Sequence, residues 1–310
     1  MSQENQSSAQ EKIILQLMTG IILRSTLWLS YFCQFSTEQD PSNTTCSQIF
    51  KREICSKLFS LEESEAYQID VAASFAPVTP RYVPILRVLF FIWSTVTLGI
   101  SINQVKPEDR FLYMGYLTRW GIIISLSYQL MAVILPFFRG HLSQPLYGEG
   151  PSSLVKLMWA LYVIAAPMES IIVLLYWYLD YEPGSKVQYT SVYNHGILAL
   201  IILIDGNILG RIPVRINQIV LFMPITILYS IWTLIHGYSG IGNGSGEGDQ
   251  LYSVIDWKGD PAATAIYIVV IVFVVSPIFF LLTWFLSIWG FGCKFNGGRR
   301  RVLNVSENMA

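Results

Sequence analysis

The chain contains few charged residues for its length, and this shortage indicates its class. Of its 310 residues only 13% are charged, whereas 53% are hydrophobic. Soluble domains carry about 25% charged residues. A low charge content is typical of membrane proteins, because helices that face lipid cannot carry unpaired ions. Proteins that bind nucleic acid usually have an excess of basic residues, whereas the formal net charge of this chain is -1. We therefore expect an integral membrane protein without a nucleic-acid partner.

The chain is also poor in residues that bind metals. Its three histidines lie far apart, and its four cysteines form no CxxC pair. The sequence therefore implies neither a metal nor an organic cofactor. The cysteines are Cys33, Cys46, Cys55 and Cys293.

Six long apolar stretches occupy most of the rest of the chain. Each approaches the roughly 20 residues that a helix needs to cross a bilayer. They predict an all-α fold, a polytopic transmembrane helical bundle of about six spans. The expected spans are residues 83–102, 112–137, 157–179, 190–209, 216–236 and 265–289.

Three further segments are expected to lie outside the bilayer core. Residues 13–35 are apolar, but Gln16 and Arg24 interrupt them, so we expect an interfacial helix or a poor span there. Residues 36–80 form a polar insert. Residues 237–248 are rich in glycine, which is typical of a flexible linker.

The Lys and Arg residues of the short loops predict the orientation of the chain. The side richer in these residues is expected to face the cytosol. The membrane is expected to be the plasma membrane or an endomembrane, and its lipids are the expected partners. The expected organisation has three parts: an N-terminal interfacial helix and polar cytosolic segment (1–82), a six-helix transmembrane domain (83–292) and a basic cytosolic tail (293–310).

Polar side chains inside the expected spans need a reason, because the bilayer makes them costly. Glu169 and Asp205 are the most costly, and each is expected to pair with Arg119 or a backbone amide. The second span carries a polar stripe whose members share one helical face and should point into the bundle. The stripe consists of Thr118, Gly121, Ser125 and Gln129.

Two polar residues are expected at the same depth in the bilayer. Thr118 lies six positions after residue 112 and His195 five after residue 190, so both lie roughly 8–9 Å from the outer starts of their spans. If the two helices are neighbours, the imidazole can take the hydroxyl proton and activate Thr118 as a nucleophile. His236 is the second candidate base, and His141 is expected in a cytosolic loop.

Structural interpretations of the same residues stay open. A threonine in a span commonly packs helices together, and a lone histidine is commonly a hydrogen-bonding group. The aromatic residues Tyr176, Trp177 and Tyr178 are interpreted as part of an interfacial belt.

Four short strings give the chain a resemblance to known families. In their order and spacing they resemble the rolling stone family of multi-pass membrane proteins and, more distantly, the androgen-induced-gene family of membrane hydrolases. Leu198 departs from the rolling stone pattern, in which an asparagine often follows the histidine by three positions. The strings are Tyr116-Leu117-Thr118-Arg119-Trp120-Gly121, Asn194-His195-Gly196 followed by Asp205, Arg211-Ile212-Pro213-Val214-Arg215, and Leu251-Tyr252 with Asp256-Trp257.

The resemblance implies a reaction for two of these residues. The hydrolase branch uses an intramembrane threonine and histidine on fatty-acid esters of hydroxy fatty acids. Its Tyr-Leu-Thr string matches residues 116–118 and its histidine matches His195. The resemblance thus implies that Thr118 is a nucleophile, His195 its base and a lipid ester the substrate. The sequence defines no oxyanion hole; Arg119 or a backbone amide is the candidate.

Two other functions stay open at this point. Rolling stone members are associated with cell fusion and development, so a non-enzymatic role in adhesion, fusion or signalling is one alternative. Asp256-Trp257 and the Gly-rich loop would then form a partner surface. A transporter that uses Glu169 and Asp205 as relay groups is another, although the chain has no evident internal repeat.

Overall fold

The computed structural model gives the chain an all-helical architecture within the residues that it describes. In these residues every regular element is a helix, which confirms the all-α prediction. The expectations for residues 13–35, the basic tail and the four cysteines concern residues outside the described part, as does the polar insert apart from Leu58 and Phe59. The described residues are 58–59, 82–138, 153–181, 186–242, 250–252 and 254–292.

Among the described residues six helices are long and apolar enough to cross a membrane, and each overlaps one of the predicted spans. The chain is therefore a multi-pass membrane protein. Several spans combine α-helix with short 3-10 or π-helical segments, labelled η. The elements are α4 (Tyr82–Asn103), α5 (Leu117–Ile134) with η2 (Leu135–Phe138), α8 (Ser153–Leu175) with η3 (Tyr176–Asp180), α9 (Tyr189–Val192), η4 (Tyr193–Ile197), α10 (Leu198–Leu203) and η5 (Ile204–Leu209), η6 (Ile216–Gln218) with α11 (Ile219–Ser239), and α12 (Pro261–Val270), η7 (Ile271–Val275) and α13 (Ser276–Gly292).

Two predicted boundaries are wrong. The second span was expected from residue 112, but a 3-10 helix, η1 (Pro107–Gly115), occupies that region and α5 begins at Leu117. The residue between them, Tyr116, has an extended backbone that separates the two helices. The Gly-rich linker was expected from residue 237, but α11 continues to Ser239.

Gly237 lies in that helix and packs closely against the side chain of Trp257. A Cβ atom at Gly237 would meet the ring of Trp257 at 2.8 Å, so only glycine allows this contact. The helix ends at Gly240, whose φ of 69° lies in the left-handed region that glycine adopts without strain. Residues 243–249 lie outside the described part.

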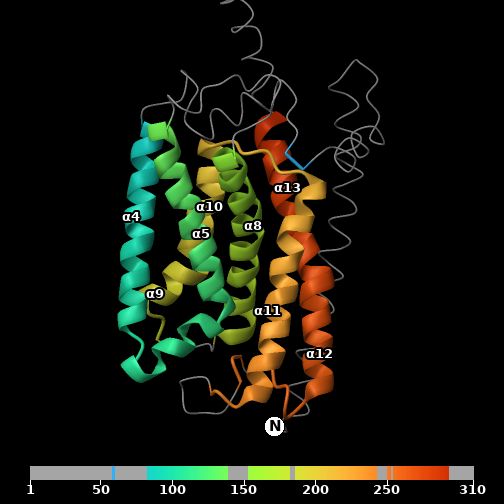
Figure 1. Ribbon diagram of the computed structural model, residues 1–310. Helices are drawn as coiled ribbons and strands as arrows, with labels where there is room; N and C mark the ends of the chain where they lie inside the picture. The colour runs from blue at the N-terminus through green and yellow to red at the C-terminus, as the bar shows by residue number, and fades with distance from the viewer. Residues whose placement is uncertain are drawn as a thin grey trace, which may run out of the picture. The chain divides into compact units, whose positions relative to one another are not determined.

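Helix α8 is the central element of the bundle. It contacts α5, α10, α11 and α13, and its ribbon stands between those of α5 and α11 in Figure 1. It is also the most buried of the six spans. The predicted stripe on α5 is buried as expected. Gly121 lies against Ile172 of α8, and the Ser125 hydroxyl donates to the Glu169 carboxylate at 2.7 Å.

Within the described ranges four π-helical segments widen the helices locally: η3, η4, η5 and η7. A π-helical turn holds one more residue than an α-helical turn, and such turns occur frequently at functional sites. Two of them lie in one span, where η4 carries His195 and η5 carries Asp205. These two polar residues of the sequence analysis therefore both sit at irregular turns.

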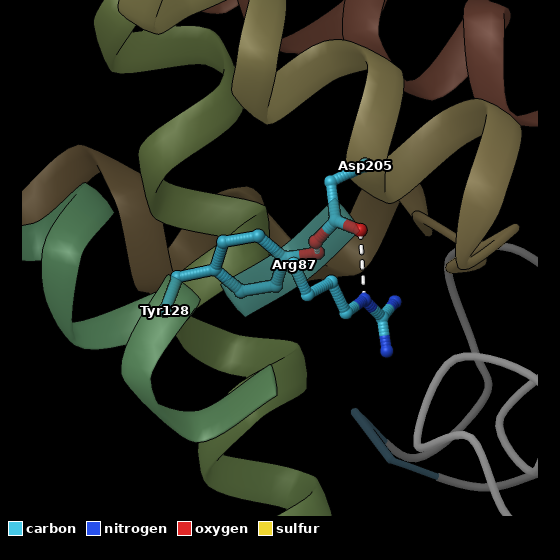
Figure 2. Close-up of polar contacts among 3 residues, drawn as sticks. All are labelled: Arg87, Tyr128 and Asp205. Carbon is cyan, nitrogen blue, oxygen red and sulfur yellow. Dashed lines mark hydrogen bonds and ion pairs between the residues drawn. The ribbon is translucent and has the colours of Figure 1, made fainter. Parts of the chain in front are cut away.

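A buried ion pair joins the first span to the fourth (Figure 2). The Arg87 Nε donates to Asp205 Oδ1 at 2.8 Å, and both side chains are at most 2% exposed. The Tyr128 hydroxyl of α5 donates to Asp205 Oδ2 at 2.6 Å. The expectation that Asp205 or Glu169 pairs with Arg119 is wrong, because Asp205 pairs with Arg87 and Glu169 accepts from Ser125.

We expect the Asp205→Leu variant to be about 3–5 kcal/mol less stable to unfolding, because it removes the carboxylate from a buried guanidinium. The measurement is a reversible detergent-unfolding titration, made in the Tyr128→Phe background so that no hydroxyl loses its acceptor. The matched control is Arg87→Met/Asp205→Leu in the same background, which replaces the ion pair by apolar groups and should lose much less. Equal losses in the two variants would contradict this account.

Candidate functional site

Thr118 and His195 meet in the structure. Thr118 is the second residue of α5, and its Oγ1 lies 3.1 Å from His195 Nε2 on η4. The expected contact between hydroxyl and imidazole is therefore present. The premise of equal depth was wrong in detail, because α5 begins five residues later than expected while the fourth span begins at Tyr189. Whether the pair is catalytic stays a prediction.

The second ring nitrogen determines the direction of this hydrogen bond. His195 Nδ1 lies 3.0 Å from the backbone carbonyl oxygen of Ser191, which can only accept. The neutral imidazole must then carry its proton on Nδ1, which leaves Nε2 as an acceptor. The Thr118 hydroxyl therefore donates to Nε2. This is the arrangement of a nucleophile, a general base and a group that orients the base.

The backbone at His195 departs from helical geometry. Its φ of -116° and ψ of 27° differ from those of its neighbours in η4. A regular α-helix directs the carbonyl of Ser191 toward the N–H of His195 itself. In the π-helical turn that carbonyl accepts the imidazole Nδ1–H.

Two aromatic residues of η3 hold His195 from the side of α8. The ring of Tyr176 stacks on the imidazole with centroids 3.6 Å apart and an interplanar angle of 6°. The indole Nε1 of Trp177 donates to the His195 carbonyl oxygen at 2.6 Å. The sequence indicates both residues only as belt aromatics, because their place near the end of a span does not show which side chain of the fourth span they contact.

A cavity of about 240 Å³ opens beside the pair. Its wall includes both Thr118 and His195, the second half of α8 with η3, the first half of α11, Tyr252, Val254 and Ile255 of the last loop, and the turns around η7. Neither Glu169 nor Asp205 lines it. Thr118 and His195 therefore adjoin a space that a ligand can enter.

The 250–255 loop and α11 fix the start of α5. The Tyr252 hydroxyl accepts the backbone N–H of Leu117 at 3.1 Å. Tyr229 and Trp232 both donate to the Gly115 carbonyl, at 3.1 and 3.0 Å. Burial raises the pKa of Tyr252 to about 12, so this phenol stays neutral at physiological pH. These contacts hold Gly115 and Leu117, which directly precede the candidate nucleophile Thr118 in the chain.

Arg119 is engaged next to the site. Its guanidinium donates to the Ser101 hydroxyl of α4 at 2.9 Å and lies 4.2 Å from the ring centroid of Tyr113. The guanidinium carries five N–H donors, and Arg119 also lines the cavity. Both oxyanion-hole candidates, Arg119 and a backbone amide at the start of α5, therefore adjoin the site.

The other candidate histidines are less well placed. His236 is buried beside Trp232 at 5.7 Å between ring centroids, and it does not line the cavity. His141 lies outside the described residues. In the part of the chain that the structure describes, no group of His, Cys, Asp and Glu side chains could hold a metal ion.

Comparisons with known proteins add no relative. No protein-family model, no curated protein and no solved structure matches the chain. The resemblance to the rolling stone and androgen-induced-gene families stays a prediction.

We expect His195 to be present as the Nδ1–H tautomer, because Ser191 can only accept and the Tyr176 stack fixes the ring plane. The ¹⁵N spectrum of labelled protein in micelles measures this, with His195→Gln identifying the signal. Tyr176→Leu should mix the two tautomers, since the ring is then free to turn. Tyr178→Leu is the matched control; Tyr178 is an exposed neighbour in η3 and should leave the spectrum unchanged. A dominant Nε2–H form in the unsubstituted protein would overturn the proposed hydrogen-bond direction.

Proposed function

We propose that the chain is a membrane-embedded hydrolase of lipid carboxylic esters, with Thr118 as nucleophile and His195 as general base. The observation that supports this is the hydrogen bond from the Thr118 hydroxyl to an imidazole oriented by a backbone carbonyl, at the wall of a cavity. The nucleophile and the base lie within hydrogen-bond reach, and a third group orients the base, which is the geometry of an activated nucleophile.

The first half of the reaction forms an acyl-enzyme. Thr118 Oγ1 attacks the ester carbonyl carbon while its proton passes to His195 Nε2. The tetrahedral intermediate then breaks its bond to the leaving oxygen, which takes the proton from Nε2 and departs as an alcohol. His195 is neutral again, and the acyl group is bound to Thr118 as an ester.

The second half regenerates the enzyme by the same proton transfers. Water attacks the acyl carbonyl and gives a proton to His195 Nε2. The Thr118 oxygen leaves and takes that proton back, and the fatty acid is released. Each proton lost by a nucleophile is thus returned to a leaving group, so no cofactor takes part.

The start of α5 supplies the electrostatic support for the oxyanion. The first N–H groups of a helix have no acceptor within that helix, and its dipole places positive charge there. The N–H of Leu117 is bonded to Tyr252 and that of Arg119 to the Tyr116 carbonyl. The N–H of Thr118, one residue from each, is the donor that we assign to the developing oxyanion.

The resemblance to the androgen-induced-gene hydrolases supplies a substrate class. It implies fatty-acid esters of hydroxy fatty acids or similar lipids. Such substrates reach the site from the bilayer itself, and the mostly apolar side chains around the cavity suit them.

No specific contact favours the two alternative functions. The Asp256 carboxylate accepts the backbone N–H groups of Lys258 and Gly259, and Trp257 packs on Gly237 and donates to Thr233. These side chains therefore stabilise their own loop, and a partner surface is not needed to explain them. Glu169 and Asp205 lie outside the cavity wall, which gives the transporter alternative no support.

We expect a hydrolase-directed activity probe to label the purified protein through Thr118. Thr118→Ala and His195→Gln should each reduce the labelling rate by about 10²-fold or more, the contribution typical of a general base. Thr118→Ser should keep labelling, because it retains a hydroxyl at the same position.

The matched control for this experiment is Thr95→Ala. Thr95 is an exposed residue of α4 whose hydroxyl donates to the Phe91 carbonyl of its own helix, so its loss should leave labelling unchanged. Equal labelling of the unsubstituted protein, Thr118→Ala and His195→Gln would remove the hydrolase proposal.

A further inference from the structure

The cavity extends far along the helices from the candidate site. On the α8 side its wall runs from Asp180 in η3 to Met168, a rise of about 18 Å along the helix. The stack of His195 on Tyr176 marks the level of the candidate pair on this wall. Met168 lies eight residues beyond that level, so the cavity continues for about 12 Å past the pair.

The hydroxyl groups on this part of the wall are already used. Thr226 donates to the Met223 carbonyl at 2.9 Å, and Ser230 donates to the Thr226 carbonyl at 2.8 Å. Ser276 donates to the Ile271 carbonyl at 2.8 Å. The Tyr229 hydroxyl donates to the Gly115 carbonyl at 3.1 Å. The other side chains that line this part are apolar: Met168, Ile171, Ile172, Leu175, Phe222, Ile268, Ile271 and Val272. The wall therefore suits a hydrocarbon chain better than a polar group.

The far end of the cavity is bounded by three buried side chains. Met168 of α8, Phe222 of α11 and Ser276 of α13 are the lining residues farthest from the Thr118 end on their helices. Each is at most 2% exposed. Behind Phe222 stands Phe280, with ring centroids 6.2 Å apart and an interplanar angle of 18°. The second ring limits the movement of the first, so we name these three residues the floor.

We infer that the cavity binds the acyl chain of the ester, fully extended from Thr118 toward the floor, and that the floor limits the length of that chain. This inference rests on the proposed hydrolase function and adds a substrate class to it, esters of medium-chain fatty acids. A depth of about 12 Å accommodates roughly ten carbons, given a C–C bond of about 1.5 Å and tetrahedral angles.

Chain-length selection follows from packing. A methylene that enters the cavity from the bilayer leaves lipid and not water, so it gains only the closer packing against the cavity wall. A chain that reaches the floor gains nothing more, and a longer chain must bend against close-packed side chains. The specificity constant should therefore rise with chain length, reach a maximum and then fall.

The test measures kcat/KM for p-nitrophenyl esters from butyrate to palmitate, with the protein in lipid nanodiscs. The unsubstituted protein should show a maximum at roughly ten carbons, and Thr118→Ala should remove the activity at every length. Phe222→Ala lowers the floor and should move the maximum to longer chains. Ser276→Val adds bulk at the floor and should move it to shorter ones.

Phe273→Ala is the matched control. Phe273 is a phenylalanine of η7 that is 63% exposed and does not line the cavity, so its loss should leave the profile unchanged. If Phe222→Ala does not fold, the shift in Ser276→Val decides the question alone. Thr118-dependent hydrolysis with the same profile in both floor variants would overturn the chain-length inference and leave the hydrolase proposal standing. Absence of Thr118-dependent hydrolysis at every length would overturn both.

Discussion

The bilayer core contains no water, so each polar side chain in it must find a partner inside the bundle. Among such contacts between different spans are those of Arg87 with Asp205, Ser125 with Glu169, and Thr118 with His195. Each contact works only when its two helices stand at one relative height and rotation. The same constraint that assembles the bundle therefore also fixes the geometry of the candidate site.

Irregular helical turns let this pairing occur at two places in the fourth span. His195 lies in η4 and Asp205 in η5, and each segment accommodates one residue more per turn than an α-helix. The extra residue changes the direction of the side chains that follow. An unbroken α-helix through this span would place the two residues at different angles around its axis, and at least one of their contacts would be lost.

The sequence predicts the fold class well because lipid imposes a simple pattern, about 20 apolar residues for each span. It also brings Thr118 and His195 together, although by an argument whose starting point, a helix from residue 112, is wrong. The contact forms although η1 and the extended Tyr116 precede α5, so that α5 starts five residues later than predicted. The fourth span, in turn, contains π-helical turns that the prediction did not include. Sequence periodicity cannot show such compensations. Arg87 and Tyr176 were missed for the same reason, since their roles depend on which helices are neighbours.

The choice of a backbone carbonyl to orient His195 suits a site in the membrane. Many hydrolases use a carboxylate for this purpose, and the carboxylate also stabilises the imidazolium that forms during the reaction. A carboxylate at lipid depth needs partners of its own, as Asp205 does with Arg87 and Tyr128. The Ser191 carbonyl fixes the same tautomer without bringing a charge into the bilayer, so the desolvation cost is avoided. The resulting base receives less stabilisation when charged, so the support of the developing oxyanion by the positive end of α5 matters more for the transition state.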